Sequence, residues 1–278
     1  MTVLVFTLLV AAGSFVAGCL GALTGMGGGV VVVPLLTLAF GVDIHYAIGA
    51  SLVSVIATSS GSAAAYVRDG YVNVRIGVLL EIATTLGALL GGILVALLAA
   101  NVVSIIFGIV LVASALSAAR VSPAGQRGPS SPLARRLRLE GQLPAHVGGD
   151  TYAVRAVPGG FAVMFLAGTL SSLLGIGSGA LKVLALDQVM HLPFKVSTTT
   201  SNFMIGVTAA AGAGVYLSHG YIETALAMPV MLGVLAGSVV GARVLVRAPS
   251  VWLKRGFIVV LLIIAVQMLL QGLEAGHG

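Results

Sequence analysis

Two glycine clusters interrupt the apolar sequence, and each could bring bare backbone against a ligand. The first, GMGGG, covers residues 25–29, and the second, GIGSG, covers residues 175–179. A helix that restarts at Gly28 or Gly29, or at Gly177 to Gly179, directs unpaired N–H groups and the positive end of its dipole into the gap. Because glycine lets a ligand approach the backbone, the chemistry expected at both breaks is the binding of a small anion.

Two ionisable residues lie inside apolar segments, where such residues are costly unless they are paired or hydrated. Lys182 follows the second cluster by about one helical turn, so its ammonium could bind the substrate or a counter-ion. The competing interpretation is a structural ion pair, for which Asp187 is a nearby acid. Glu81 is a candidate proton carrier; the alternative is a carboxyl that is neutral or hydrogen-bonded to Thr84 or to another helix.

Uncharged polar side chains gather in two stretches, SLVSVIATSSGS at 51–62 and VSTTTSNFMIGVT at 196–208. Ser and Thr can donate to carbonyls of their own helix, which would make their role local. Their density instead favours neutral donors that hold an oxyanion weakly enough to release it. The candidate ligands are Ser51, Ser54, Thr58, Thr199, Ser201 and Asn202.

Other site chemistries find little support in the sequence. Cys19 is the only cysteine, which excludes an intramolecular disulfide and a CxxC metal site. The histidines are scattered, and there is no HExxH motif and no nucleophile–base pair at a plausible spacing. We therefore expect no enzymatic activity, no metal and no cofactor.

The composition places these residues in a membrane protein. Hydrophobic residues make up 58% of the 278 residues, charged residues only 8%, and the mean hydropathy is +1.12. The 14 Lys and Arg against 8 Asp and Glu lie mostly between apolar segments, where they set topology, so nucleic acid is not an expected partner. The expected partners are the lipid bilayer, a small anionic substrate and a coupling proton. The oligomeric state is left open, with a homodimer among the options.

The chain is an internal duplication. An offset of 150 residues places Ser51 on Ser201, Gly70-Tyr71 on Gly220-Tyr221 and Gly87 on Gly237. Each half divides into five apolar segments, and because five is odd the halves should enter the membrane in opposite senses. We predict an all-α membrane protein, an inverted-repeat bundle of about ten transmembrane segments, with the glycine steps at 87–91 and 237–241 as close helix contacts. The segments are 3–24, 28–41, 45–67, 74–98 and 101–119, then 157–174, 178–191, 196–217, 223–246 and 251–272, of which 28–41 and 178–191 are short or broken.

Charge predicts the orientation of these segments. If all ten cross, the connections at 68–75, 120–156 and 247–255 share one side and hold the arginines, so that side is cytoplasmic and both termini lie outside. Short segments that did not cross would separate Arg68 and Arg75 from the long loop, which disfavours that topology. The expected location is the bacterial inner membrane. The domains are a first repeat at 1–119, a basic cytoplasmic linker at 120–156 and a second repeat at 157–278, the linker being flexible with one short helix around 132–140. Binding of the linker to anionic headgroups is the alternative to a plain tether.

The pattern G-x-G-G-G-x-x-x-V-P from Gly25 to Pro34, followed by AIGASLVSVIATSSGS and repeated as GIGSG with TTTSN, resembles the TauE/SafE, or sulfite exporter, family of permeases. The resemblance covers nearly the whole chain outside the linker. It implies a secondary transporter of small sulfur-containing or organic anions, such as sulfite, sulfoacetate or other sulfonates, working in export. The sites it implies are Gly25, Gly27, Gly28, Gly29 and Pro34, then Gly175, Gly177 and Gly179.

The sequence departs from this pattern in its second half. Ser178 stands where the first repeat has Gly28, and Leu184 stands where it has Pro34, so the second site is expected to be looser or asymmetric. Related thiosulfate-uptake proteins that work through several cysteines are disfavoured, since Cys19 is alone. The predicted function is alternating access around a midplane site between the two breaks. The alternatives are an anion channel and a non-transporting membrane scaffold.

Overall fold

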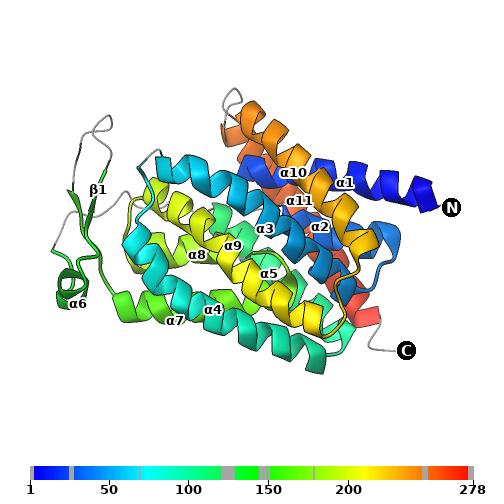
Figure 1. Ribbon diagram of the computed structural model, residues 1–278, viewed down its shortest axis with the longest axis horizontal. Helices are drawn as coiled ribbons and strands as arrows, with labels where there is room; N and C mark the ends of the chain where they lie inside the picture. The colour runs from blue at the N-terminus through cyan, green and yellow to red at the C-terminus, as the bar shows by residue number, and fades with distance from the viewer. Residues whose placement is uncertain are drawn as a thin grey trace.

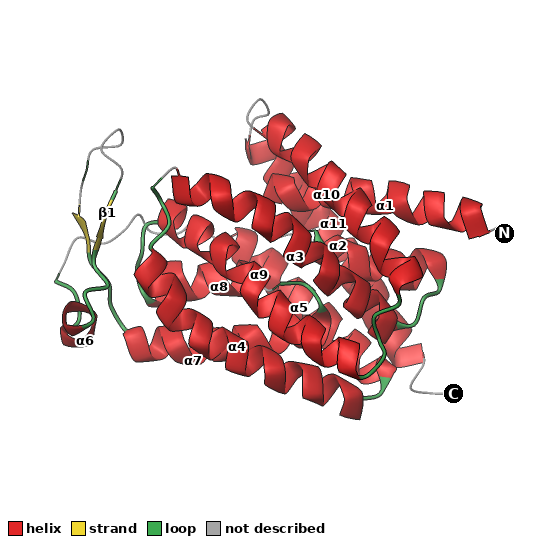
Figure 2. Ribbon diagram, in the orientation of Figure 1, coloured by secondary structure: helices red, strands yellow, loops and turns green. Residues whose placement is uncertain are grey.

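The computed structural model is a bundle of helices with one small two-stranded sheet at one end (Figures 1 and 2). It describes residues 3–24, 28–68, 70–119, 129–143, 149, 151–177, 179–245 and 250–274. Figure 1 shows both chain ends at one end of the bundle and the segment between the two halves, with α6 and β1, at the other. The prediction of an all-α membrane protein is confirmed.

The apolar segments of the first half form helices that end within a few residues of their predicted bounds. Most of these helices end beside Gly, Asp or Asn or at a polar turn, whereas the helices at 74–97 and 100–119 are separated only by Leu98 and Ala99. The short second segment is an α-helix that continues as a π-helix, η1. The elements are α1 (Val3–Thr24), α2 (Gly29–Pro34), η1 (Leu35–Ala39), α3 (Ile44–Arg68), α4 (Val74–Leu97) and α5 (Ala100–Ala119).

The second half repeats this order of elements. Its short segment is again an α-helix followed by a π-helix, so both short segments predicted from the sequence are confirmed as short. The elements are α7 (Val157–Leu174), α8 (Gly179–Leu184), η3 (Ala185–Val189), α9 (Phe194–Ser218), α10 (Thr224–Leu245) and α11 (Ser250–Glu274).

The main helix contacts join one half to the other. Helix α1 packs on α10, α4 on α7, α5 on α11 and α3 on α9. Among the described residues four helices are long and apolar enough to cross a membrane: α1, α4, α7 and α10. Large apolar side chains cover the outside of the bundle, as in Val78, Ile82 and Leu86 of α4, each more than half exposed. Such a surface fits lipid and not water.

Small residues allow two of these helix pairs to approach closely, and the same contacts recur in both pairs. A Cβ added at any of the four central glycines would clash with a backbone carbonyl oxygen of the partner helix. The contacts are Gly87 with Phe165 and Gly168 with Thr84 between α4 and α7, and Gly237 with Phe15 and Gly18 with Val234 between α10 and α1. The prediction that the steps at Gly87, Gly91 and Gly237 are helix contacts is therefore confirmed.

The described part of the linker is folded. It contains α6 (Pro132–Arg136) and the antiparallel strands β1 (Gly141–Gln142) and β2 (Thr151–Tyr152). Asn73, at the start of α4, fixes it to the bundle: its Nδ2 donates to the Leu139 carbonyl and to the Tyr152 hydroxyl, both at 2.9 Å. The expected short helix is present, and these hydrogen bonds join the described part of the linker to the bundle, whereas its composition predicts a flexible tether.

Candidate anion site

The first glycine break leaves a helix start without a side-chain cap. Helix α2 begins at Gly29, and Gly28 at its N-cap position has no side chain to accept from the first turn. Both glycines are buried, and the Gly28 carbonyl accepts from the N–H groups of Val31 and Val32 at 3.1 Å. A buried helix start of this kind is suited to a ligand that accepts hydrogen bonds. Gly25, Gly27 and Ser178 lie outside the described residues.

The structure brings the two breaks together. The Ser51 hydroxyl of α3 donates to the Gly175 carbonyl oxygen of the second half at 2.6 Å. A Cβ on Gly29 would lie 2.6 Å from that same oxygen, so no larger residue fits there without displacement. Gly175 and Gly177 have φ of +66° and +67°, a conformation that favours glycine. In the second half, Ser201 of α9 donates to the Gly179 carbonyl at 3.2 Å.

The two ionisable residues singled out in the sequence are linked through a third residue. Lys182 on α8 is completely buried, and its ammonium donates to the Thr208 hydroxyl of α9 at 2.5 Å. That hydroxyl donates to Oε1 of Glu81 on α4 at 2.6 Å. The Glu81 carboxyl therefore bonds to another helix, which is one of the alternatives to a proton carrier that the sequence leaves open. The hydroxyl of Thr84 instead donates to the main-chain carbonyls of Leu80 and Glu81.

The remaining polar candidates divide into two groups. Ser54, Thr58 and Thr199 donate to carbonyls one turn earlier in their own helices, as the local interpretation of these hydroxyls predicts. Their oxygens keep acceptor capacity, but their hydrogens are committed in this conformation. Asn202 is half-buried, and its amide makes no hydrogen bond to the described residues. Ser51 and Ser201 donate to carbonyls at the second glycine break, and Asn202 keeps its amide available. These three side chains thus remain the best candidates for neutral anion ligands.

Sequence reasoning missed Thr208 as the link between the two charged residues. It lies seven residues, about two turns, after Ser201, and therefore on the same face of α9. That spacing places both hydroxyls toward α8 and could have identified it. Which residue of α4 would meet this face depends on the packing of the two halves, which the sequence alone does not specify.

The electrostatics of this centre are those of a balanced pair. One ammonium and one carboxyl share a hydroxyl, and Glu81 Oε2 is buried without a hydrogen-bond partner among the described residues. Within the described part of the chain, no group of three or more His, Cys, Asp or Glu side chains could hold a metal ion. The arrangement can exchange a proton and bind an anion at the ammonium.

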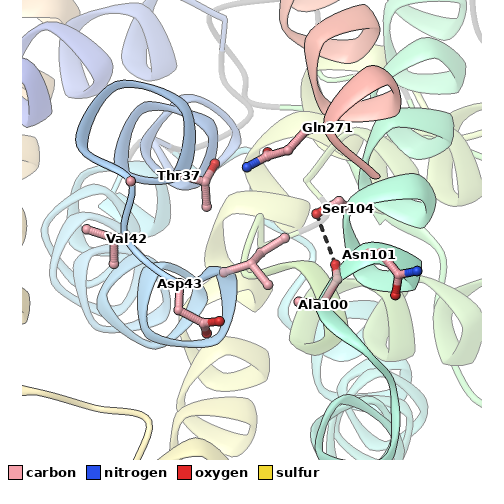
Figure 3. Close-up of a pocket in the computed structure, with 9 residues that line it drawn as sticks. Thr37, Val42, Asp43, Ala100, Asn101, Ser104 and Gln271 are labelled. Carbon is pink, nitrogen blue, oxygen red and sulfur yellow. Dashed lines mark hydrogen bonds between the residues drawn. The ribbon is translucent and has the colours of Figure 1, made fainter. Parts of the chain in front are cut away.

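A separate pocket of about 200 Å³ lies between residues of η1, the η1–α3 connection, α5 and α11 (Figure 3). Asp43, Asn101 and Gln271 contribute polar groups to its lining, whereas Ser104 commits its hydroxyl to the Ala100 carbonyl at 3.0 Å. Among the described residues the lining includes a carboxyl and no basic side chain, so this pocket does not suit an anion as well as the glycine breaks do. The candidate site is therefore placed at the breaks and Lys182.

Fold and site together define an integral membrane protein with a buried, charged centre between its two halves. Residues 10–268 match the family model described as Sulfite exporter TauE/SafE, and the chain belongs to this family.

The similar proteins are bacterial. The chain is 29% identical to the "Probable membrane transporter protein YunE" of Bacillus subtilis (strain 168), over 96% of this chain and 98% of that protein. It is 28% identical to YdhB of the same organism, over 86% and 91%, and 27% identical to a "Probable membrane transporter protein" of Xylella fastidiosa (strain 9a5c), over 97% of each. No solved structure matches the chain with statistical significance.

Proposed function

We propose that the protein is a secondary transporter that exports small sulfur-containing or organic anions, such as sulfite, sulfoacetate or other sulfonates. Family membership and the names of the relatives support a membrane transporter. The single observation that carries the choice of an anion is Lys182, a fully buried ammonium on a short helix that opens at a glycine break. A buried cation attracts an anion strongly because little water screens it.

The substrate would lie between the breaks. Backbone N–H groups at Gly28 and Gly29 would donate from one half, and Lys182 would supply charge from the other. Ser51, Ser201 and Asn202 would add neutral donors once their present bonds are exchanged. Neutral donors and one cation suit a carrier, because a site that held the anion with several charges would release it slowly.

The two halves would form an inverted repeat around this site. Four contacts between α4 and α7 and between α10 and α1 recur at the same offset, as a two-fold relation between the halves requires. The ends of the bundle repeat as well: the Lys195 ammonium lies 4.6 Å from the centre of the Tyr71 ring, and the equivalent His45 stacks on Tyr221 at 5.1 Å. If the two halves rocked about this two-fold axis, the contact at one end of the bundle would open while the contact at the other end stayed closed.

The orientation follows from the charges at the two ends. Arg75, Arg138 and the arginines of α6 lie at one end of the bundle, and the start of α1 and the end of α11 lie at the other (Figure 1). We assign the basic end to the cytoplasmic side of a bacterial inner membrane, because cytoplasmic loops carry an excess of Lys and Arg.

A thermal-shift titration of the purified protein tests the anion site. The panel is sulfite, sulfate, sulfoacetate, taurine and matched carboxylates, and a ligand raises the melting temperature by mass action. We expect a saturable shift with at least one sulfonate or sulfite, lost in Lys182→Gln and kept in Lys195→Gln, a lysine outside the site. A shift with zwitterions or cations alone would contradict the proposal.

Flux measurements separate the alternatives to a carrier. A carrier shows saturable uptake into proteoliposomes. An anion channel would show far faster flux without saturation, and a scaffold would show none.

A further inference from the structure

The Thr208 hydroxyl has one hydrogen and two acceptors within reach. Glu81 Oε1 lies at 2.6 Å, and the Met204 carbonyl one turn earlier on α9 lies at 3.2 Å. An ionised carboxylate is the stronger acceptor, so it takes the hydrogen and holds Lys182 through the same oxygen. When the carboxyl is protonated, the hydroxyl can turn to Met204, and the lysine loses its link to a negative charge.

We infer that anion binding at Lys182 and protonation of Glu81 are coupled one to one, so that the transporter moves each anion together with a proton. The inference rests on the proposed anion site and assigns the coupling ion to it. Thr208 is the positioning residue that connects the two charges.

Charge balance gives the reason for the coupling. Without substrate the centre holds one ammonium and one carboxylate, and its net charge is zero. A monoanion beside Lys182 would leave a net negative charge in a buried place, which costs far more than it would in water. A proton on Glu81 restores neutrality, so each ligand favours the other.

Few other charges face this centre. Helices α5 and α7, which pack on α8 and α4, bear no acidic, basic or histidine side chain over 100–119 and 157–174. Helix α9 has Lys195 in its first turn, over the Tyr71 ring, and α4 has Arg75 at its start, where its guanidinium donates to the Arg138 carbonyl. Asp187 lies on η3, five residues after Lys182, and is the acid of that element.

The coupling also constrains export. A monoanion with a proton carries no net charge, so the membrane potential does not drive the cycle. Export then runs down the concentration gradient of the anion, and a cytoplasm more alkaline than the outside opposes it.

The test is the pH dependence of binding of isethionate, a sulfonate that stays ionised between about pH 5.5 and about pH 8.5. Above the point where Glu81 ionises, the Kd should rise tenfold per pH unit, the slope for one linked proton. Over the pH range in which Lys182 stays protonated, Glu81→Gln should bind with a Kd that does not vary with pH. Glu223→Gln, at an exposed acid in the α9–α10 connection, should keep the slope of the parent.

A second measurement needs no variant. Mixing isethionate with the parent protein in weakly buffered detergent solution above that ionisation point should take up one proton per anion bound, seen as a rise in pH with an indicator dye. Binding without proton uptake would overturn the coupling and leave the anion site intact. Loss of the pH slope in Asp187→Asn, with the slope kept in Glu81→Gln, would overturn the assignment to Glu81. Absence of isethionate binding at every pH would overturn the proposed anion site for sulfonates and the coupling with it.

Discussion

Replacing Gly168 by Ala should destabilise the protein, and replacing Gly18 should do so equally. The new Cβ at Gly168 would clash with the Thr84 carbonyl oxygen, and the new Cβ at Gly18 with that of Val234. Overpacking costs about 1–3 kcal/mol, and the upper value applies because neither backbone can rotate away. Alanine returns about 1 kcal/mol of helix propensity, which leaves a loss of about 2 kcal/mol.

The assay is the fraction of detergent-purified protein that stays monodisperse on size exclusion after heating. A loss of about 2 kcal/mol should lower the midpoint by roughly 4–8 °C. Gly214→Ala is the matched control, since a Cβ there meets nothing within 4 Å, and its midpoint should stay level or rise. If Gly168→Ala lowers the midpoint and Gly18→Ala does not, the two helix contacts are not equivalent. If neither variant differs from Gly214→Ala, the close-packing argument fails.

Three further predictions concern buried polar side chains. Asn73→Ala should lower the free energy of unfolding by about 2–3 kcal/mol, because it removes the helix cap on the Ile76 N–H, at 3.1 Å, and two donated bonds to the linker. The same assay of heating followed by size exclusion should show this loss. Ser51→Ala should cost about 1–3 kcal/mol in the same assay, since the buried Gly175 carbonyl loses its donor. Burial raises the pKa of the Tyr152 hydroxyl, so its neutral form is favoured in the folded state. The stability that this provides should hold below about pH 10 and fall above it. Tyr152→Phe should lessen that alkaline loss in melting curves taken across this range.

The helix boundaries could be predicted because local sequence specifies them. Apolar runs end at residues such as Asn73, whose side chain caps α4, and at Gly220, whose φ is +76°. The linker could not be predicted in the same way. Its hydrogen bonds to Asn73 join residues far apart in the chain, and its Pro, Gly and Ser content by itself indicates a tether.

The sequence identifies candidate residues of the site but not the hydrogen bonds that join them. Lys182 and Glu81 were identified because ionisable residues are rare in apolar segments. Their link through Thr208 depends on how α4, α8 and α9 pack, and no local pattern encodes that packing. The density of hydroxyls does not show where they donate: Ser54, Thr58 and Thr199 donate within their own helices, and Ser51 and Ser201 donate to carbonyls at the second glycine break.

The pairing of α1 with α10 has a consequence for synthesis. About 200 residues separate the end of α1 at Thr24 from the start of α10 at Thr224. At roughly 5–20 residues per second, the ribosome needs roughly 10–40 s to make that length. Helix α1 therefore lies in the bilayer with Gly18 unpacked until α10 has been synthesised and inserted. A ribosome that stalls in the second half leaves an unpartnered small-residue face in the membrane, the kind of surface on which wrong helix associations begin.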